Sequence, residues 1–149
     1  MDFTAEERNA LRNALKRVFF LEHLKMAELD ALINGMEKLP FRKGDRLIRQ
    51  GEPGEAFYII SSGSLGVYKR MLGLLRFRIA TRRRGDFVGE MALIDRAPRN
   101  ATIIADGDGE AFFISRSTFD QVLLGNPSIA EMIRKVAEGR RAQDRAAGF

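Results

Sequence analysis

The stretch that decides the fold is residues 87–105, which read FVGEMALIDRAPRNATIIA. Gly89 has no side chain, so the backbone there can come close to a ligand. The amides that open the short apolar turn, residues 90–92, are expected to lack partners inside that turn and to point at an anion. Arg99 offers a planar fork of donors to two phosphate oxygens, and an ionised Glu90 accepts a hydrogen bond from a sugar hydroxyl. The stretch therefore has the parts that hold one phosphate and one sugar.

The order of residues in this stretch resembles the phosphate-binding cassette of cyclic nucleotide-binding domains. Such domains occur in cyclic-nucleotide-dependent kinases, gated channels and catabolite-activator-type regulators. The family pattern is roughly F-G-E, an apolar residue, A-L, a short spacer, and then P-R-x-A-T before an apolar strand. A Gly-Glu pair alone would carry no information, but the whole string is specific. The matching residues are Phe87, Gly89, Glu90, Ala92, Leu93, Pro98, Arg99, Ala101 and Thr102.

Helix patterns occupy both ends of the chain. Thr4 and Glu7 have the spacing of a capping box, which predicts a helix from that point. A second helix is expected over 25–36, where apolar residues fall at i, i+3, i+4 and i+7. Helix signals return at Ser115 and stop at Gly125.

Between the helices the pattern changes to short strands separated by turn residues. Residues 106–109, DGDG, predict a hairpin turn between the last two strands. Regular short strands with glycine turns favour a β-sandwich or barrel. The expected strands are 46–50, 56–61, 65–70, 74–81, 102–105 and 110–114.

The resemblance implies a fold that is mainly β with flanking helices. It is an eight-stranded β-roll, also described as a double-stranded β-helix or jelly roll, with N-terminal helices and C-terminal lid helices. We expect one domain, because 149 residues suffice for a single core. Residues 1–40 would form its N-terminal helical segment, 41–114 the β-roll with the cassette at 87–105, and 115–149 the C-terminal helices and tail.

Composition narrows the functional classes. The chain has no cysteine, so it forms no disulfide and no thiolate metal site. Its longest apolar run, residues 56–60, is far too short for a membrane span, and no N-terminal signal pattern is present. We therefore expect a soluble, cytoplasmic protein. The net charge of +5 suits nucleic acid or a solvated surface with an anion site, and the second is favoured because no single helix collects the positive charges.

The resemblance also implies a ligand, cyclic AMP or cyclic GMP, and a role for each cassette residue. Arg99 would pair with the phosphate, helped by the amides of Met91 and Ala92, and Glu90 would receive the ribose 2′-hydroxyl. The alternatives are a surface Arg99 paired with Asp95 or Glu90, and a Glu90 that only stabilises a helix N-terminus. The expected ligand-binding residues are Gly89, Glu90, Met91, Ala92, Arg99, Asn100, Ala101 and Thr102.

Asn100 departs from the family pattern, in which alanine, serine or threonine often follows the arginine. In the family, a hydroxyl at this position is associated with recognition of guanine. The amide of Asn100 has both donors and an acceptor, so it suits contact with guanine, neutrality toward adenine, or simple capping of the local turn. Adenine is slightly favoured, because cyclic AMP is the commoner ligand of such domains.

A lid over the base is the remaining element that the resemblance implies. The candidate is the helix pattern over 129–136, with Ile133, Arg134 or Val136 reaching the base. The alternative is a helix that only packs on the core. Residues 19–24 would shift in concert with the lid.

No catalytic arrangement is evident in the sequence. His23 is the only histidine, and no nucleophile has a base partner, so we expect neither an enzyme nor a metal or other cofactor. About twenty residues follow Ser128, too few for a helix-turn-helix, so direct DNA binding is not expected. The chain is predicted to be a cyclic nucleotide sensor that changes conformation and regulates a protein partner. The alternatives are an interaction or scaffold module that keeps the fold without binding nucleotide, and a sensor fragment of a larger transcription regulator or channel.

Overall fold

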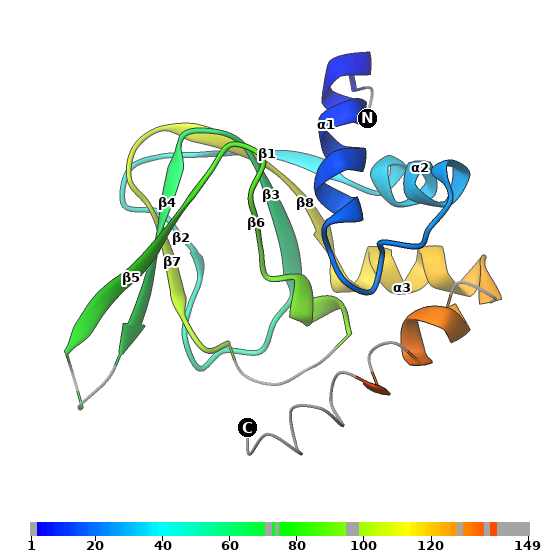
Figure 1. Ribbon diagram of the computed structural model, residues 1–149. Coiled ribbons are helices and arrows are strands. Elements are labelled where there is room, and N and C mark those ends of the chain that lie inside the picture. The colour runs from blue at the N-terminus through cyan, green and yellow to red at the C-terminus, as the bar shows by residue number, and fades with distance from the viewer. Residues whose placement is uncertain are drawn as a thin grey trace.

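The computed structural model describes residues 3–70, 73, 75–94, 99–127, 130–135 and 138–139. Within them a roll of strands has helices at one end (Figure 1). The helices are α1 (Ala5–Lys16), α2 (Met26–Asn34), the short 3-10 helix η1 (Glu90–Leu93) and α3 (Arg116–Leu124). The strands are β1 (Glu37–Phe41), β2 (Arg46–Ile48), β3 (Ala56–Ser62), β4 (Ser64–Arg70), β5 (Arg76–Arg83), β6 (Phe87–Val88), β7 (Thr102–Ala105) and β8 (Gly109–Ser115).

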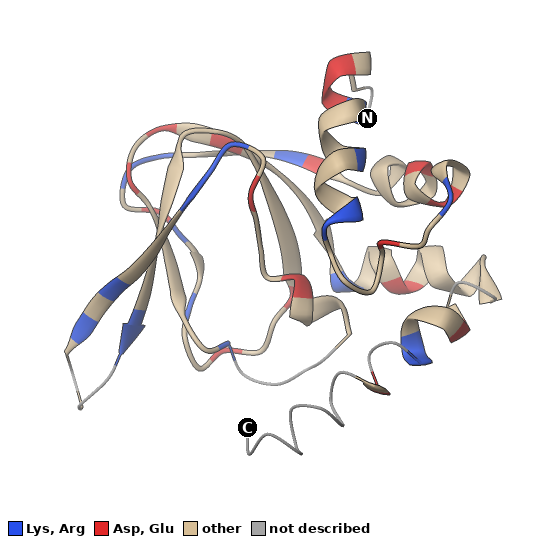
Figure 2. Ribbon diagram, viewed as in Figure 1, with Lys and Arg blue, Asp and Glu red and all other residues tan. Residues whose placement is uncertain are grey.

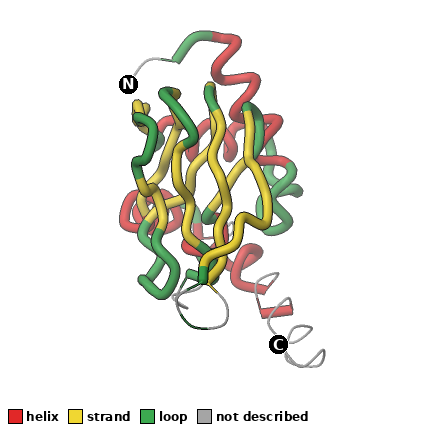
Figure 3. Tube along the Cα trace, turned by 90° about the vertical axis from the view of Figure 1, so that its left-hand side faces the viewer, coloured by secondary structure: helices red, strands yellow, loops and turns green. Residues whose placement is uncertain are grey.

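The strands form two four-stranded sheets in which every pair is antiparallel. One sheet has the order β1-β8-β3-β6 and the other β2-β7-β4-β5. Figure 3 shows the strands in front of the helices, so the helical layer lies to one side of the roll. The expected mainly β fold, an eight-stranded roll with flanking helices, is confirmed.

Side-chain caps begin two of the helices where the sequence predicted them. The Thr4 hydroxyl accepts the Glu7 N–H at 3.0 Å, and the Thr4 N–H donates to Glu7 Oε1 at 2.9 Å. The Ser115 hydroxyl accepts the Thr118 N–H at 3.1 Å, and α3 ends against Gly125. Each cap satisfies a backbone N–H that the first turn of a helix leaves without a partner.

Strand structure starts earlier than expected. β1 begins at Glu37, inside the segment that was predicted to be helical up to residue 40, and pairs along β8 from Glu37↔Phe113 to Phe41↔Gly109. Pro40 of β1 has no N–H to donate to a ladder. β1 lies at the edge of its sheet, where proline is tolerated.

The predicted hairpin at 106–109 is wrong. β7 and β8 belong to different sheets, so the chain crosses the roll at this turn. The Asp106 N–H donates to Ser64 O at 3.0 Å, and its carboxylate accepts from the Ser64 hydroxyl at 2.8 Å. At Gly109 an added Cβ would stand 2.4 Å from Ser62 O. These contacts tie the turn to the β3–β4 turn instead of closing a hairpin.

Two hydrophobic clusters hold the structure. The larger joins the helices to β3 and β8 and includes Leu15, Ile33, Phe57, Phe112 and Phe119, which are all buried. The smaller fills the roll between the two sheets. Its buried members are Phe41, Ile48, Ile60, Leu65, Val67, Val88, Ala101, Ile103, Ala105 and Ala111. The helices therefore cover one end of the roll, while the apolar side chains of the smaller cluster lie between the two sheets.

Basic residues gather along the β4–β5 hairpin (Figure 2). Arg78 lies across Gly66 and forms an ion pair with Asp106 at 2.8 Å. Exposed Phe77 and Ile79 lie on the same strand, and exposed Leu75 directly precedes it. No helix in the described part of the chain is long and apolar enough to cross a membrane.

Candidate functional site

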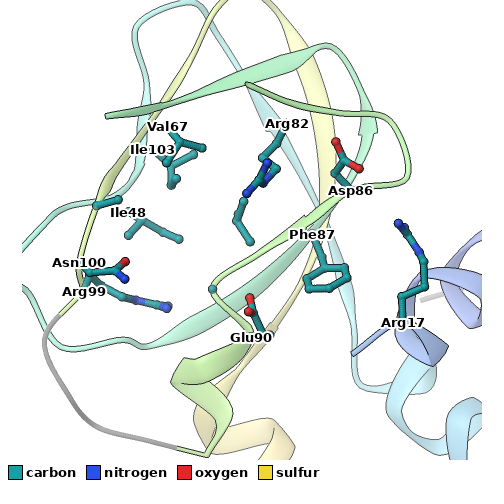
Figure 4. Close-up of a pocket in the computed structure, with 13 residues that line it drawn as sticks. Arg17, Ile48, Val67, Arg82, Asp86, Phe87, Glu90, Arg99, Asn100 and Ile103 are labelled. Atoms are coloured by element: carbon teal, nitrogen blue, oxygen red, sulfur yellow. The ribbon is translucent and has the colours of Figure 1, made fainter. Parts of the chain in front are cut away.

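A cavity of about 360 Å³ opens inside the roll beside η1 (Figure 4). Residues from both sheets, from η1 and from the end of α1 line it. Five of the predicted ligand-binding residues are among them, and Met91, Ala92 and Thr102 are not. The lining residues are Arg17, Ile48, Val67, Arg82, Asp86, Phe87, Val88, Gly89, Glu90, Arg99, Asn100, Ala101 and Ile103.

Arg99 extends along one wall of this cavity (Figure 4). Its Nη2 donates to the Ala56 carbonyl oxygen at 2.7 Å, which holds the guanidinium in place. Burial lowers the pKa of Arg99, although an arginine still keeps its charge at neutral pH. Among the described residues no carboxylate lies within ion-pair distance of it, so an ion pair with Glu90 is not formed. Asp95, the other partner considered, and Pro98 lie outside the described residues.

Two glycines let the backbone pack against this guanidinium. Gly89 has a φ of +82°, and an added Cβ would stand 2.8 Å from Ala56 O and 3.0 Å from Arg99 Nη2. At Gly54 the added atom would stand 2.7 Å from Arg99 Cζ. In the sequence, Gly54 indicates only a turn. The signal available was the run GEPG at 51–54, a turn signal that holds two glycines.

Only some of the backbone amides at residues 90–92 are available to bind an anion. The Ala92 N–H donates to Gly89 O at 3.0 Å, so the expectation that it lacks a partner is wrong. The cause is the 3-10 geometry of η1, whose i→i+3 bonds already satisfy the third residue of the turn. The amides of Glu90 and Met91 have no backbone acceptor among the described residues. They are the two donors that η1 leaves for an anion.

Thr102 and Ala101 support the site from the core side. Thr102 is buried, and its hydroxyl accepts the Gln50 N–H at 3.0 Å, which ties β7 to the second residue after β2. Ala101 is also buried and lines the cavity. Asn100 is exposed at the rim beside Arg99 (Figure 4). Thr102 therefore positions the strand, while Ala101 and Asn100 face the space a ligand would take.

Sequence reasoning missed the far side of the cavity, formed by Arg17, Arg82, Asp86 and Phe87. Arg17 donates to the Gly85 carbonyl oxygen, and its Cζ lies 5.7 Å from the centre of the Phe87 ring. In the sequence, Arg82 stands out only as part of the basic run 82–84. The signal that could have found it is its place on a strand that leads directly into the cassette.

The candidate lid residues do not line the cavity in this structure. Ile133 is 3% exposed and belongs to the larger hydrophobic cluster. Arg134 is exposed and pairs with Glu131 at 2.5 Å and Glu138 at 2.7 Å, both on its own segment. Val136 lies outside the described residues. A lid role for this segment stays a prediction that requires it to move.

Comparison with known proteins agrees with this geometry. The family model for the cyclic nucleotide-binding domain matches residues 38–126. Similar curated proteins include cAMP-dependent protein kinase regulatory subunits of Hypocrea atroviridis, 32% identical, and Aspergillus fumigatus, 31% identical, each over 83% of this chain. The chain spans 26% and 29% of their lengths, so it corresponds to one part of them.

Solved structures show the same fold. The N-terminal domain of a transcriptional regulator from Streptomyces coelicolor A3(2) has a TM-score of 0.76 at 20% identity, and the match covers 91% of this chain and 95% of that one. A cyclic nucleotide-binding-like protein from Brucella abortus has a TM-score of 0.68 at 32% identity, with 77% and 97% covered. The regulatory domain of Toxoplasma gondii PKA with cAMP reaches 0.74 at 25% identity, with 95% and 50% covered. This chain belongs to the cyclic nucleotide-binding domain family.

Proposed function

We propose that this chain binds a 3′,5′-cyclic purine nucleotide, cyclic AMP or cyclic GMP, and acts as a ligand sensor without catalysing a reaction. One observation carries the proposal: the half-buried guanidinium of Arg99 faces a cavity with no carboxylate in ion-pair distance among the residues described. A buried charge without a partner is costly, and an anionic ligand would relieve that cost.

The chemistry of the cavity suits a cyclic phosphodiester. Such a group carries one negative charge on two free oxygens, which match the donor fork of Arg99 and the free amides of Glu90 and Met91. The Glu90 carboxylate lines the same cavity, where it would accept the ribose 2′-hydroxyl. The base would then lie against the apolar side chains of Ile48 and Val67.

A route from the site to the C-terminal helices supports a sensor role. Arg116, the first residue of α3, donates from Nη1 to Ala92 O of η1 at 3.2 Å. A ligand that moves η1 would therefore act on α3 and on the candidate lid that follows it. Such a change requires different ligand affinities in the two arrangements, and closure of the segment 129–136 over the base would supply the difference.

A protein partner is part of the proposal. The curated relatives are regulatory subunits of a cAMP-dependent kinase, and their name supports a regulatory output for this chain as well. An interaction or scaffold module that does not bind nucleotide is the competing proposal. We place the protein in the cytoplasm, where its ligand would be made.

Calorimetric titration with cyclic AMP and cyclic GMP tests the proposal. Binding in the micromolar range or tighter is expected for at least one of them, about −8 kcal/mol. The linear nucleotides 5′-AMP and 5′-GMP serve as controls and should bind more weakly, because their phosphate carries a second charge and is not closed into the 3′,5′-cyclic ring. If neither cyclic nucleotide produces heat of binding, the proposal fails and the competing one, a scaffold module that does not bind nucleotide, is favoured.

A further inference from the structure

The end of the β4–β5 hairpin combines exposed apolar side chains with basic ones. Of the five large apolar side chains that are exposed in the described part of the chain, three lie within five residues of one another, namely Leu75, Phe77 and Ile79. Arg70 and Arg76, which are also exposed, are paired in register at the same place. We propose that this hairpin end docks on a membrane surface that contains anionic lipids, with its apolar side chains inserted between the headgroups and its arginines beside lipid phosphates and carboxylates.

Positive charge is concentrated in this part of the sequence. Residues 56–85 contain seven lysines and arginines and no aspartate or glutamate, whereas the other 119 residues contain 18 basic and 20 acidic ones. The net charge of +5 therefore arises from this segment alone. Figure 2 shows basic residues on both strands of the hairpin. A surface of this charge is attracted to anionic lipids, which give the cytoplasmic leaflet of a membrane its negative potential.

Two arginines at the hairpin end are available to an anionic partner. Among the described residues no carboxylate lies within ion-pair distance of Arg70 or Arg76. Arg78, by contrast, is paired with Asp106 at 2.8 Å and is held against the roll. The backbone of the hairpin end is braced, because Gln50 Oε1 accepts the Arg70 N–H at 2.7 Å. The arginine side chains are therefore presented from a fixed backbone.

The shape of the hairpin favours a deformable partner. β5 is the last strand of its sheet and, among the described strands, pairs only with β4. Figure 1 shows the hairpin extending out of the roll on the side away from the helices. A projecting amphipathic end can insert into a lipid interface, whereas a folded protein would need a matching groove.

Two other occupants fit the hairpin end less well. Nucleic acid would satisfy the arginines through its phosphates but would leave Leu75 and Ile79 exposed to water. A second copy of the chain, paired along the free edge of β5, would bring the arginines of both copies together. An anionic bilayer accepts both the charge and the apolar side chains.

Co-sedimentation with vesicles tests the inference on the full chain. The vesicles contain an equal mixture of phosphatidylcholine and phosphatidylserine, and pure phosphatidylcholine is the reference. At low ionic strength the unchanged chain should bind the mixed vesicles about tenfold or more tightly than the neutral ones. Added salt should weaken this binding, because it screens the attraction between exposed charges.

A matched pair of arginine variants locates the electrostatic contact. Arg70→Gln/Arg76→Gln should weaken binding to the mixed vesicles about tenfold or more, because each cation near an anionic surface contributes to the attraction. Arg83→Gln/Arg84→Gln removes the same charge from exposed positions at the opposite end of β5 and should weaken binding at most about threefold.

A second matched pair tests insertion of the apolar side chains. Leu75→Ser should weaken binding to the mixed vesicles about fivefold or more, because a leucine that enters the interface leaves water. Leu124→Ser, at an exposed leucine of α3, makes the same chemical change on another face and should leave binding unchanged.

Three results would overturn the inference and leave the proposed function intact. The first is no binding of the unchanged chain to the mixed vesicles at low ionic strength. The second is an equal loss in the two arginine double variants, which would mean that only net charge matters. The third is unchanged binding by Leu75→Ser, which would exclude insertion. Soluble polyglutamate that binds as tightly as the mixed vesicles would then assign the hairpin end to an acidic protein partner.

Discussion

The guanidinium of Arg99, in the segment before β7, is fixed to the Ala56 carbonyl oxygen of β3 by a hydrogen bond of 2.7 Å. The same carbonyl lies 2.8 Å from the position that a Cβ on Gly89 would occupy. One peptide group of β3 therefore sets both the arginine and the glycine of the cassette. A ligand meets an arginine that is already oriented, which lowers the entropy cost of binding.

Replacing this arginine should abolish most of the affinity. Arg99→Ala is expected to weaken binding of the preferred cyclic nucleotide by about 2–4 kcal/mol, because it removes a charge-assisted contact to the phosphate. Arg83→Ala, an exposed arginine outside the cavity, is the matched control. Calorimetry measures both, and an Arg99→Ala variant that binds as tightly as Arg83→Ala would remove Arg99 from the site.

Gly54 should matter for ligand binding because the absence of a side chain there leaves room for the Arg99 guanidinium. In Gly54→Ala the new Cβ would stand 2.7 Å from both Arg99 Cζ and the Ala92 Cβ, so the guanidinium must move. We expect binding about tenfold weaker, roughly 1.4 kcal/mol. Gly107→Ala is the control, since nothing lies within 4 Å of its added atom. Equal affinities of the two variants would show that the position of Arg99 does not depend on Gly54.

Glu90 should set the preference for ribose over 2′-deoxyribose. Glu90→Gln replaces a charged acceptor by a neutral one, so the ratio of affinities for the ribose ligand and its 2′-deoxy analogue should fall by about fivefold. Glu37→Gln, exposed on β1, should leave the ratio unchanged. The readout is the pair of dissociation constants for each variant. A ratio that Glu90→Gln does not alter would place the 2′-hydroxyl elsewhere.

The link between η1 and α3 should carry the response to ligand. Arg116→Leu removes the hydrogen bond to Ala92 O, so ligand should still bind while its effect on hydrogen exchange in α3 diminishes. Arg83→Leu, at an exposed arginine outside the cavity, is the control. Hydrogen-exchange mass spectrometry with and without ligand compares them. An undiminished response in Arg116→Leu would mean that coupling runs through other contacts.

Asp106 should make the stability of the roll depend on pH. Hydrogen bonds from Arg78 lower the pKa of Asp106 to about 2. Because the pKa is lower in the folded state, the carboxylate stabilises the fold above about pH 4, and this contribution is lost as the pH falls toward 2.

In Asp106→Asn the free energy of unfolding should drop by about 1 kcal/mol at pH 7, a modest value because the pair is partly exposed. The difference from the unchanged chain should vanish near pH 2. Exposed Asp108→Asn is the control, and denaturant unfolding at several pH values is the measurement. A deficit that persists at low pH would mean that the asparagine perturbs the turn in another way.

Local signals predicted much of the fold. The caps at Thr4 and Ser115 and the stop at Gly125 lie where the sequence placed them, because such signals act within a few residues. The pairing of strands did not follow from local signals. The turn at 106–109 has the composition of a hairpin, yet contacts with Ser64 and Arg78, distant in sequence, direct the chain into the other sheet.

The residues of the site also divide into those that local sequence predicts and those that depend on packing between distant segments. Gly89, Glu90 and Arg99 could be predicted because one continuous motif contains them. Arg82 and Gly54 could not, since only the packing of β5 brings Arg82 to the cavity and only the packing of the 51–54 turn brings Gly54 against Arg99. The structure was also needed to see that the Ala92 N–H is already bonded within η1. The sequence pattern here is the same for a 3-10 turn and for an α-helical turn.

An NMR titration of the 15N-labelled chain with a cyclic nucleotide tests the central claim most directly. We predict saturable shifts that are largest at the amides of Glu90 and Met91 and at the Arg99 side chain, with the Gly107 amide unaffected. Shifts confined to another surface, or none at millimolar ligand, would contradict the assignment of this cavity as a cyclic nucleotide site.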